Sequence, residues 1–227
     1  MSHELRTPLN AIGGYVDLLE LGIRGPVSEE QLVDLRRIRR SKDVLLGLIN
    51  DLLSFAKLEG GAVRYVVTDV ALDEVLRQSG EFLEPQMAAK AIAFVHAPVD
   101  PALRVRADAD KLQQVVLNLL SNAIKFTGAG GTITLAVDAG DGEVRVRVTD
   151  TGRGIPADRL EAIFDPFVQV HDRALHDREG IGLGLAISRE LTQGMGGTLG
   201  VTSELGRGTT FTITLPRADD DTRRAVG

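Results

Sequence analysis

Apolar residues in the first sixty positions recur at helical spacing. Intervals of three and four residues are typical of a helix packed in a bundle. The first series is Leu5, Leu9, Ile12, Val16 and Leu19. The second is Leu35, Ile38, Leu45, Ile49, Leu52 and Ala56, with Lys42 as its one polar member. Glycines and a proline at 22–26 separate the two series, and a capping box from Ser28 to Gln31 begins the second. The pattern predicts an antiparallel helical hairpin.

Each predicted helix carries one apolar stripe, and a two-helix hairpin has too little core to bury both stripes. Two hairpins would bury them by forming a four-helix bundle. We therefore expect a homodimer that assembles through residues 1–60. Pro8 cannot donate a backbone hydrogen bond to Glu4, so it also predicts a kink in the first helix.

After Gly61 the pattern changes to short β-rich runs that alternate with longer helical stretches. We expect strands at 63–67, 92–96, 103–107, 132–137, 144–149, 198–203 and 209–215, and helices at 72–90, 109–127 and 183–195. This order predicts an α+β fold with helices on one face of a mixed sheet. The expected domains are a helical one at 1–60 and a sheet-containing one at 61–217, followed by a flexible tail at 218–227.

Composition narrows the classes of function. The net charge of -6 disfavours a nucleic-acid binder, and the basic run 36–40 fits a solvated helix face or a docking rim. The chain has no cysteine, which excludes disulfides and zinc-thiolate sites and fits a reducing compartment. No apolar run approaches the ~20 residues that a membrane helix needs. We expect a cytoplasmic fragment of a longer sensor protein, without membrane contact of its own.

His3 is the first candidate for chemistry. A neutral imidazole is a nucleophile near pH 7, and the carboxylate of Glu4 could orient it and take its proton. The kink expected at Pro8 would leave this turn open to a large substrate. The plain alternative is a solvent-exposed histidine with an acidic neighbour.

Three polar residues interrupt the apolar helix expected at 109–127. Asn118, Asn122 and Lys125 are four and three residues apart, so they share one face of the helix. Two amides and an ammonium on one face could meet a magnesium ion and the phosphates that it bridges. The alternative is that they are capping or surface groups.

Two glycine-rich turns follow. Asp150 is expected at the end of a strand, and Gly152 and Gly154 follow it. A carboxylate there can accept a hydrogen bond from the exocyclic amine of adenine, and the glycines allow a flat ligand to approach. Gly182, Leu183 and Gly184 precede a helix, whose free amides can bind an anion. The second turn could also be mistaken for a dinucleotide fingerprint. However, a polar loop replaces the usual preceding strand, and no βαβ unit follows.

Residues 2–9, SHELRTPL, resemble the H box of the HisKA-type histidine kinases. The segments at 118–126, 150–156, 164–167 and 180–185 are similar to the N, G1, F and G2 boxes of the same family, in the same order. The resemblance implies that His3 accepts phosphate, that Glu4 acts as base, and that Thr7 positions water when the enzyme acts as a phosphatase. The implied fold is a dimeric helical hairpin joined to a Bergerat-type ATP-binding sandwich.

The resemblance also assigns the nucleotide site. It implies that Asn118 ligates Mg, that Asn122 and Lys125 contact phosphate, and that Thr209 lies near adenine. The implied cofactors are ATP and Mg, and the implied partner is the receiver domain of a response regulator. The polar loop at 168–179 corresponds to an ATP lid, in which Arg173 or Arg178 could reach the γ-phosphate. Ile181 departs from the small or hydroxylated residue that is usual in the family.

Two other classes of function compete with this interpretation. A Bergerat-type ATPase of the chaperone or topoisomerase kind shares the N and glycine boxes, but it needs no phosphorylatable histidine. A degenerate kinase would dimerise and bind a partner without catalysis. The complete H box opposes the first alternative, and the intact set of polar and glycine residues opposes the second.

Overall fold

The computed structural model describes residues 2–140, 142–169 and 181–218, and the side chains from Glu4 onward. Most of the expected lid and nearly all of the expected tail lie outside these residues. The described chain divides into two compact units, and the first consists mainly of the residues up to Val63. Among the described helices, none is both long enough and apolar enough to span a membrane.

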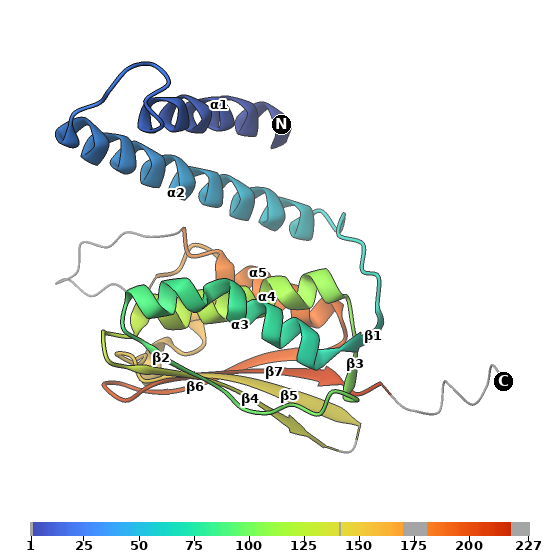
Figure 1. Cartoon of the computed structure of the whole chain (residues 1–227). Helices are drawn as coiled ribbons and strands as arrows, with labels where there is room; N and C mark the ends of the chain where they lie inside the picture. The colour runs from blue at the N-terminus through green and yellow to red at the C-terminus, as the bar shows by residue number, and fades with distance from the viewer. Residues whose placement is uncertain (1, 141, 170–180, 219–227) are drawn as a thin grey trace. The chain divides into compact units, whose positions relative to one another are not determined.

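The first unit is the predicted hairpin. Helix α1 (Ser2–Glu20) and helix α2 (Glu29–Glu59) lie side by side and antiparallel (Figure 1). The capping box is confirmed: the Gln31 amide donates to Ser28 Oγ, and the Ser28 amide donates to Gln31 Oε1. Helix α1 is assigned as one continuous helix through Pro8, and the kink expected there stays a prediction.

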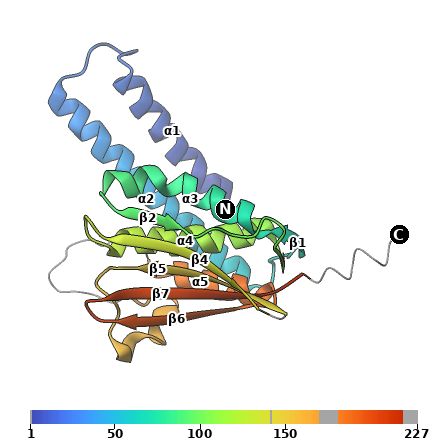
Figure 2. The same cartoon turned by 60° about the horizontal axis from the view of Figure 1, so that its bottom comes forward.

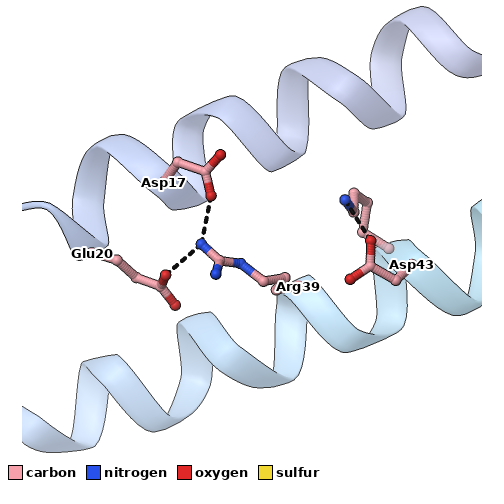
Figure 3. A network of polar contacts seen from close by, with 5 residues as sticks. Asp17, Glu20, Arg39 and Asp43 are labelled. Atoms are coloured by element: carbon pink, nitrogen blue, oxygen red, sulfur yellow. Dashed lines mark hydrogen bonds and ion pairs between the residues drawn. The ribbon is translucent and has the colours of Figure 1, made fainter. Parts of the chain in front are cut away.

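Polar contacts join the two helices near their turn. The guanidinium of Arg39 on α2 reaches two carboxylates of α1, with Asp17 Oδ1 at 2.5 Å and Glu20 beside it (Figure 3). Farther along the hairpin, a Cβ added to Gly13 would lie 3.4 Å from Lys42 Nζ, and this ammonium is 2.6 Å from Asp43 Oδ1. The polar member of the second apolar series therefore extends its side chain over a glycine on the facing helix.

The second unit is built on a five-stranded mixed sheet in the order β2-β4-β5-β7-β6. Its strands are β2 (Ala93–His96), β4 (Thr132–Ala139), β5 (Glu143–Asp150), β7 (Gly208–Pro216) and β6 (Thr198–Glu204). Only β2 and β4 pair in parallel among the described strands. Strands β1 (Thr68–Ala71) and β3 (Arg104–Ala107) form a separate antiparallel pair. Two short 3-10 helices, η1 (Ala157–Arg159) and η2 (Ala162–Phe164), follow β5.

Helices α3 (Leu72–Ala89), α4 (Ala109–Phe126) and α5 (Gly184–Gly194) cover one face of this sheet (Figures 1 and 2). Strand β5 shows why. Val144, Val146 and Val148 are buried and alternate with more exposed residues, so their side chains face the helices. The α+β fold expected from the sequence is confirmed. Asp150 is the next buried position in this alternation. It is polar, yet its side chain lies in the same interior as the three valines.

One expected strand is wrong. Residues 63–67 are not a strand, because their partners are side chains and packing surfaces instead of a neighbouring strand. The Val66 amide donates to Asp108 Oδ2 at 2.8 Å, and the Tyr65 ring packs so closely on Gly194 that an added Cβ would collide with it. Burial, with Glu190 and Asp108 nearby, raises the pKa of Tyr65. The β-rich composition of this segment therefore reflects packing within the second unit, and strand β1 begins only at Thr68.

Candidate functional site

Helix α4 presents the three predicted polar residues on its half-buried face. Asp108 caps its start by accepting a hydrogen bond from the Lys111 amide at 3.2 Å. Its last turn is closed by Lys90 of the chain after α3, whose Nζ donates to the carbonyls of Ile124 at 2.6 Å and Lys125 at 3.0 Å. Lys90 was not predicted, because a lysine that follows a helix gives no signal of a distant partner.

Asn118 lies against the start of α5. Its Nδ2 donates to Ser188 Oγ at 2.8 Å, and a Cβ added to Gly184 would be 2.5 Å from its Oδ1. A larger residue at position 184 would therefore displace the Asn118 side chain. The bond to Ser188, which the sequence did not reveal, uses the amide nitrogen as donor, so the amide oxygen is the atom left to act as a ligand. Asn122 and Lys125 are half-buried on the same helix.

Asp150 is the buried carboxylate at the end of β5, with 5% of its surface exposed. It accepts hydrogen bonds from the Gly152 amide at 2.8 Å and from the backbone of Thr209, the residue opposite it on β7. Burial raises the pKa of Asp150 above its ordinary value of 3.8, and the two amide bonds oppose that rise. The predicted pair of Asp150 and Thr209 is thus adjacent in the structure.

The first glycine turn joins α4 to the β6–β7 hairpin. A Cβ on Gly152 would lie 2.5 Å from the Phe126 carbonyl at the end of α4. Gly154 has φ of +71°, and a Cβ there would collide with the Glu204 carbonyl. Both positions therefore exclude larger residues. The first glycine turn therefore lies against the last residue of α4, whereas Gly184 of the second lies against Asn118 on the same helix.

Ser203 on β6 ties this region together, although its sequence context gave no signal. Its Oγ donates to the Gly208 carbonyl at 2.7 Å and accepts from the Ile155 amide at 2.8 Å. It is also 2.9 Å from Thr209 Oγ1. A shallow hollow of about 350 Å³ includes Asp150, Ser203 and Thr209, but none of the α4 residues lines it.

The remaining predicted residues are placed only in part. Gly182 has φ of +79°, and Leu183 is buried directly before α5. Within the F box, Phe164 is buried and packs edge-on against Phe211 with ring centroids 6.4 Å apart, whereas Phe167 is 56% exposed. Arg173 and Arg178 lie outside the described residues.

The H box occupies the beginning of α1. His3 is part of this helix, and its side chain lies outside the described atoms. Glu4 and Thr7 are exposed on the same helix. Arg6, which follows His3 by one turn, donates two hydrogen bonds to Asn50 on α2.

The donor set fits magnesium held together with phosphates. Among the described residues no cluster of three His, Cys, Asp or Glu side chains could hold a metal alone. Mg²⁺ is usually bound by one or two protein oxygens plus substrate phosphates, so a single amide oxygen such as that of Asn118 is sufficient.

Family models agree with this assembly of residues. Residues 1–61 match the His Kinase A phospho-acceptor domain, and residues 107–219 match the ATPase domain of histidine kinases, DNA gyrase B and HSP90. The chain belongs to the sensor histidine kinase family, of which it carries the catalytic core.

Individual relatives support the same placement. The chain is 36% identical to the sensor histidine kinase GacS of Pseudomonas protegens over 234 residues, which are 100% of this chain and 25% of GacS. It resembles the crystal structure of full-length ShkA in complex with AMPPNP, with TM-score 0.79 and 40% identity over 96% of this chain and 44% of ShkA. It also resembles the histidine kinase ThkA in complex with the response regulator TrrA, with TM-score 0.67 and 26% identity over 95% and 59% of the two chains. The chain spans only 25% to 36% of the length of the first curated relatives that it matches.

Proposed function

We propose that this chain uses ATP to phosphorylate His3 and passes the phosphoryl group to an aspartate on the receiver domain of a response regulator. The observation that carries the proposal is that α4 packs against both glycine turns, through Asn118 at Gly184 and through Phe126 at Gly152, in a chain that also bears a complete H box. An ATPase without a phosphoacceptor would need the nucleotide-binding residues but not the H box. The ShkA complex with AMPPNP and the ThkA complex with TrrA support the nucleotide and the partner by analogy.

Recognition of adenine falls to Asp150. Two backbone amides hold its carboxylate in place, and its two oxygens have further lone pairs that can accept a hydrogen bond. The exocyclic amine of adenine would donate to it, and guanine offers no such donor at that position. Thr209 and the Gly152–Gly154 turn would line the base, because Thr209 and Gly152 are both bonded to the carboxylate of Asp150.

Phosphate binding falls to α4 and the second glycine turn. Lys125 and Asn122 would contact phosphate oxygens, and the first amides of α5, after Gly182 and Leu183, would bind the phosphate chain. Asn118 would contribute its amide oxygen to Mg²⁺, which would supply neutralisation of phosphate charge.

The transfer itself is an in-line displacement at the γ-phosphorus by the imidazole of His3. Glu4 would accept the imidazole proton, and ADP would leave with the electrons of the broken bond. The phosphohistidine would then transfer its phosphoryl group to the regulator's aspartate. We extend the proposal to the reverse task, in which Thr7 would position water to hydrolyse the aspartyl phosphate.

The hairpin supports a homodimer. Five apolar side chains recur at intervals of seven along it and remain 42% to 49% exposed: Leu5, Ile12, Ile38, Leu45 and Leu52. Such a series is the seam of a helical bundle that lacks its second half. We propose that a second copy of the chain covers this series.

We also propose that the functional domains are 1–60 and 61–217, and that this part of the protein works in the cytoplasm, where ATP is supplied.

The test is acid-labile incorporation of radiolabelled γ-phosphate from Mg-ATP into the chain, with His3→Gln as control. Label on the parent alone, which then moves to an added receiver domain, is the expected result. Absence of label from a parent that binds ATP would favour the degenerate binding module.

A further inference from the structure

A forked hydrogen bond joins the H box to the second helix. The Nη2 and Nε atoms of Arg6 donate to Asn50 Oδ1 at 2.8 and 3.2 Å. Arg6 lies one helical turn after His3, and Asn50 lies on the part of α2 that faces the beginning of α1. Two donors that converge on one oxygen fix the direction of the guanidinium as well as its distance.

This contact belongs to the same antiparallel register as the polar contacts near the turn. Arg6 and Asp17 are as far apart along α1 as Asn50 and Arg39 are along α2. The Gly13 and Lys42 contact falls between them (Figure 3 shows the end at Arg39). The turn at 21–28 holds the helices together covalently at one end only. At the other end, which carries His3, side-chain contacts must set the position of α1.

The first turn of α1 needs such a contact more than other turns do. Pro8 lies inside α1 and cannot donate a backbone hydrogen bond to the carbonyl of Glu4. The turn between His3 and Thr7 is therefore weakly held by its own backbone.

We propose that Asn50 is a positioning residue for the phosphoryl transfer, and that it acts through Arg6 to hold the His3 turn in the orientation needed for attack. This inference rests on the proposed kinase activity. Asn50 does not touch the reacting imidazole. Its effect passes through the Arg6 side chain and the backbone of α1, so it is not a catalytic residue.

A purely structural role predicts something different. The Arg6–Asn50 contact is solvent-exposed, and exposed polar pairs contribute little to stability. Its loss should leave folding and ATP binding nearly unchanged. Displacement of a reacting group by about 1 Å can nevertheless slow a reaction by up to ~10²-fold. Loss of the Arg6–Asn50 contact should therefore slow the labelling of His3 without lowering the stability of the fold.

The experiment compares Asn50→Leu, Asn50→Asp and the parent chain. At saturating Mg-ATP, Asn50→Leu should label His3 about tenfold more slowly, whereas Asn50→Asp keeps an acceptor oxygen and should stay within about twofold of the parent. The ATP dissociation constant and the helical circular dichroism signal should be the same in all three. Arg37→Met, which removes an ion pair within α2, is the matched surface control.

Parental rates in Asn50→Leu, or equal slowing in Asn50→Asp, would overturn the proposal. If Asn50→Leu loses helical signal, Arg6→Leu carries the same test, and the Arg6→Leu, Asn50→Leu double variant should be no slower than the slower single variant. Labelling of the parent and of His3→Gln distinguishes a failure of the proposed kinase activity from a failure of the proposed positioning role. An unlabelled parent refutes the kinase activity, whereas a labelled parent with a parental Asn50→Leu rate refutes only the positioning role.

Discussion

The two units of this chain differ most in what they bury. In the hairpin only three described hydrophobic side chains are buried, Leu9, Val16 and Leu35. The second unit encloses a core in which Leu112, Leu119, Ile133 and Ile213 are fully inaccessible. A structure with so little interior depends on a partner, whereas the second unit is self-contained. The difference indicates that assembly governs the acceptor part of the chain and that local packing governs the nucleotide part.

A change at Gly208 should have the largest effect, and it should be confined to the second unit. Gly208 has φ of +118°, and an added Cβ would collide with the Asp150 carbonyl. Gly208→Ala should lower the free energy of unfolding of this unit by about 2 to 4 kcal/mol and abolish ATP binding. Thermal unfolding and calorimetric ATP titration measure both.

Gly206→Ala is the control for this prediction. Gly206 has a similar φ of +83°, but nothing lies within 4 Å of an added Cβ. Gly206→Ala should lower the free energy of unfolding by only about 1 to 2 kcal/mol and should retain ATP binding. Equal effects of the two substitutions would mean that the contact with Asp150 is unimportant.

A charge in the exposed apolar series should break assembly and spare the nucleotide site. Leu45 is 46% exposed. Leu45→Asp should weaken dimerisation on the order of 100-fold, because burial of an unpaired carboxylate at a helix interface costs several kcal/mol. Sedimentation equilibrium measures the change. Val33→Asp, at 44% exposure and off the series, should leave the dimer intact, and similar weakening by both would argue against this interface.

Removal of the Ser203 hydroxyl should have a smaller effect on the second unit. Ser203→Ala deletes the bonds to Gly208 and Ile155 in the hollow that also includes Asp150. The expected loss is about 1 to 2 kcal/mol of unfolding free energy, with several-fold weaker ATP binding. Chemical denaturation gives the first value. An unchanged denaturation midpoint would show that water replaces the hydroxyl.

The smallest predicted effect is a pH dependence of ATP binding. The pKa of Asp150 is raised above 3.8 in the folded chain. Its contribution to stability is therefore full below pH 3.8 and is lost as pH rises through the raised value. ATP affinity should change in the opposite sense, since only the ionised carboxylate keeps its full acceptor capacity. Affinity should fall with decreasing pH before other aspartates are protonated, and calorimetric ATP titration of the parent at a series of acidic pH values measures this fall. An affinity that stays constant while Asp150 is protonated would contradict its role in binding adenine.

Helical spacing and capping predicted the hairpin closely, because those signals are local. The segment 63–67 shows where such signals fail. Its β-branched and aromatic residues suit a strand, yet Tyr65 and Val66 dock on Gly194 and Asp108, far away in sequence. The candidate site followed the same rule. Asn118 and Asp150 stood out within motifs, whereas Lys90, Ser188 and Ser203 act through partners that only the fold brings near.

The central claim is that one unit binds ATP and the other accepts its phosphate. Mg-ATP affinity and acid-labile label should be measured in parallel for the parent, His3→Gln and Asp150→Asn. We expect His3→Gln to bind ATP as the parent does and take no label, and Asp150→Asn to lose both ATP binding and label. Equal label on the parent and His3→Gln would contradict the account.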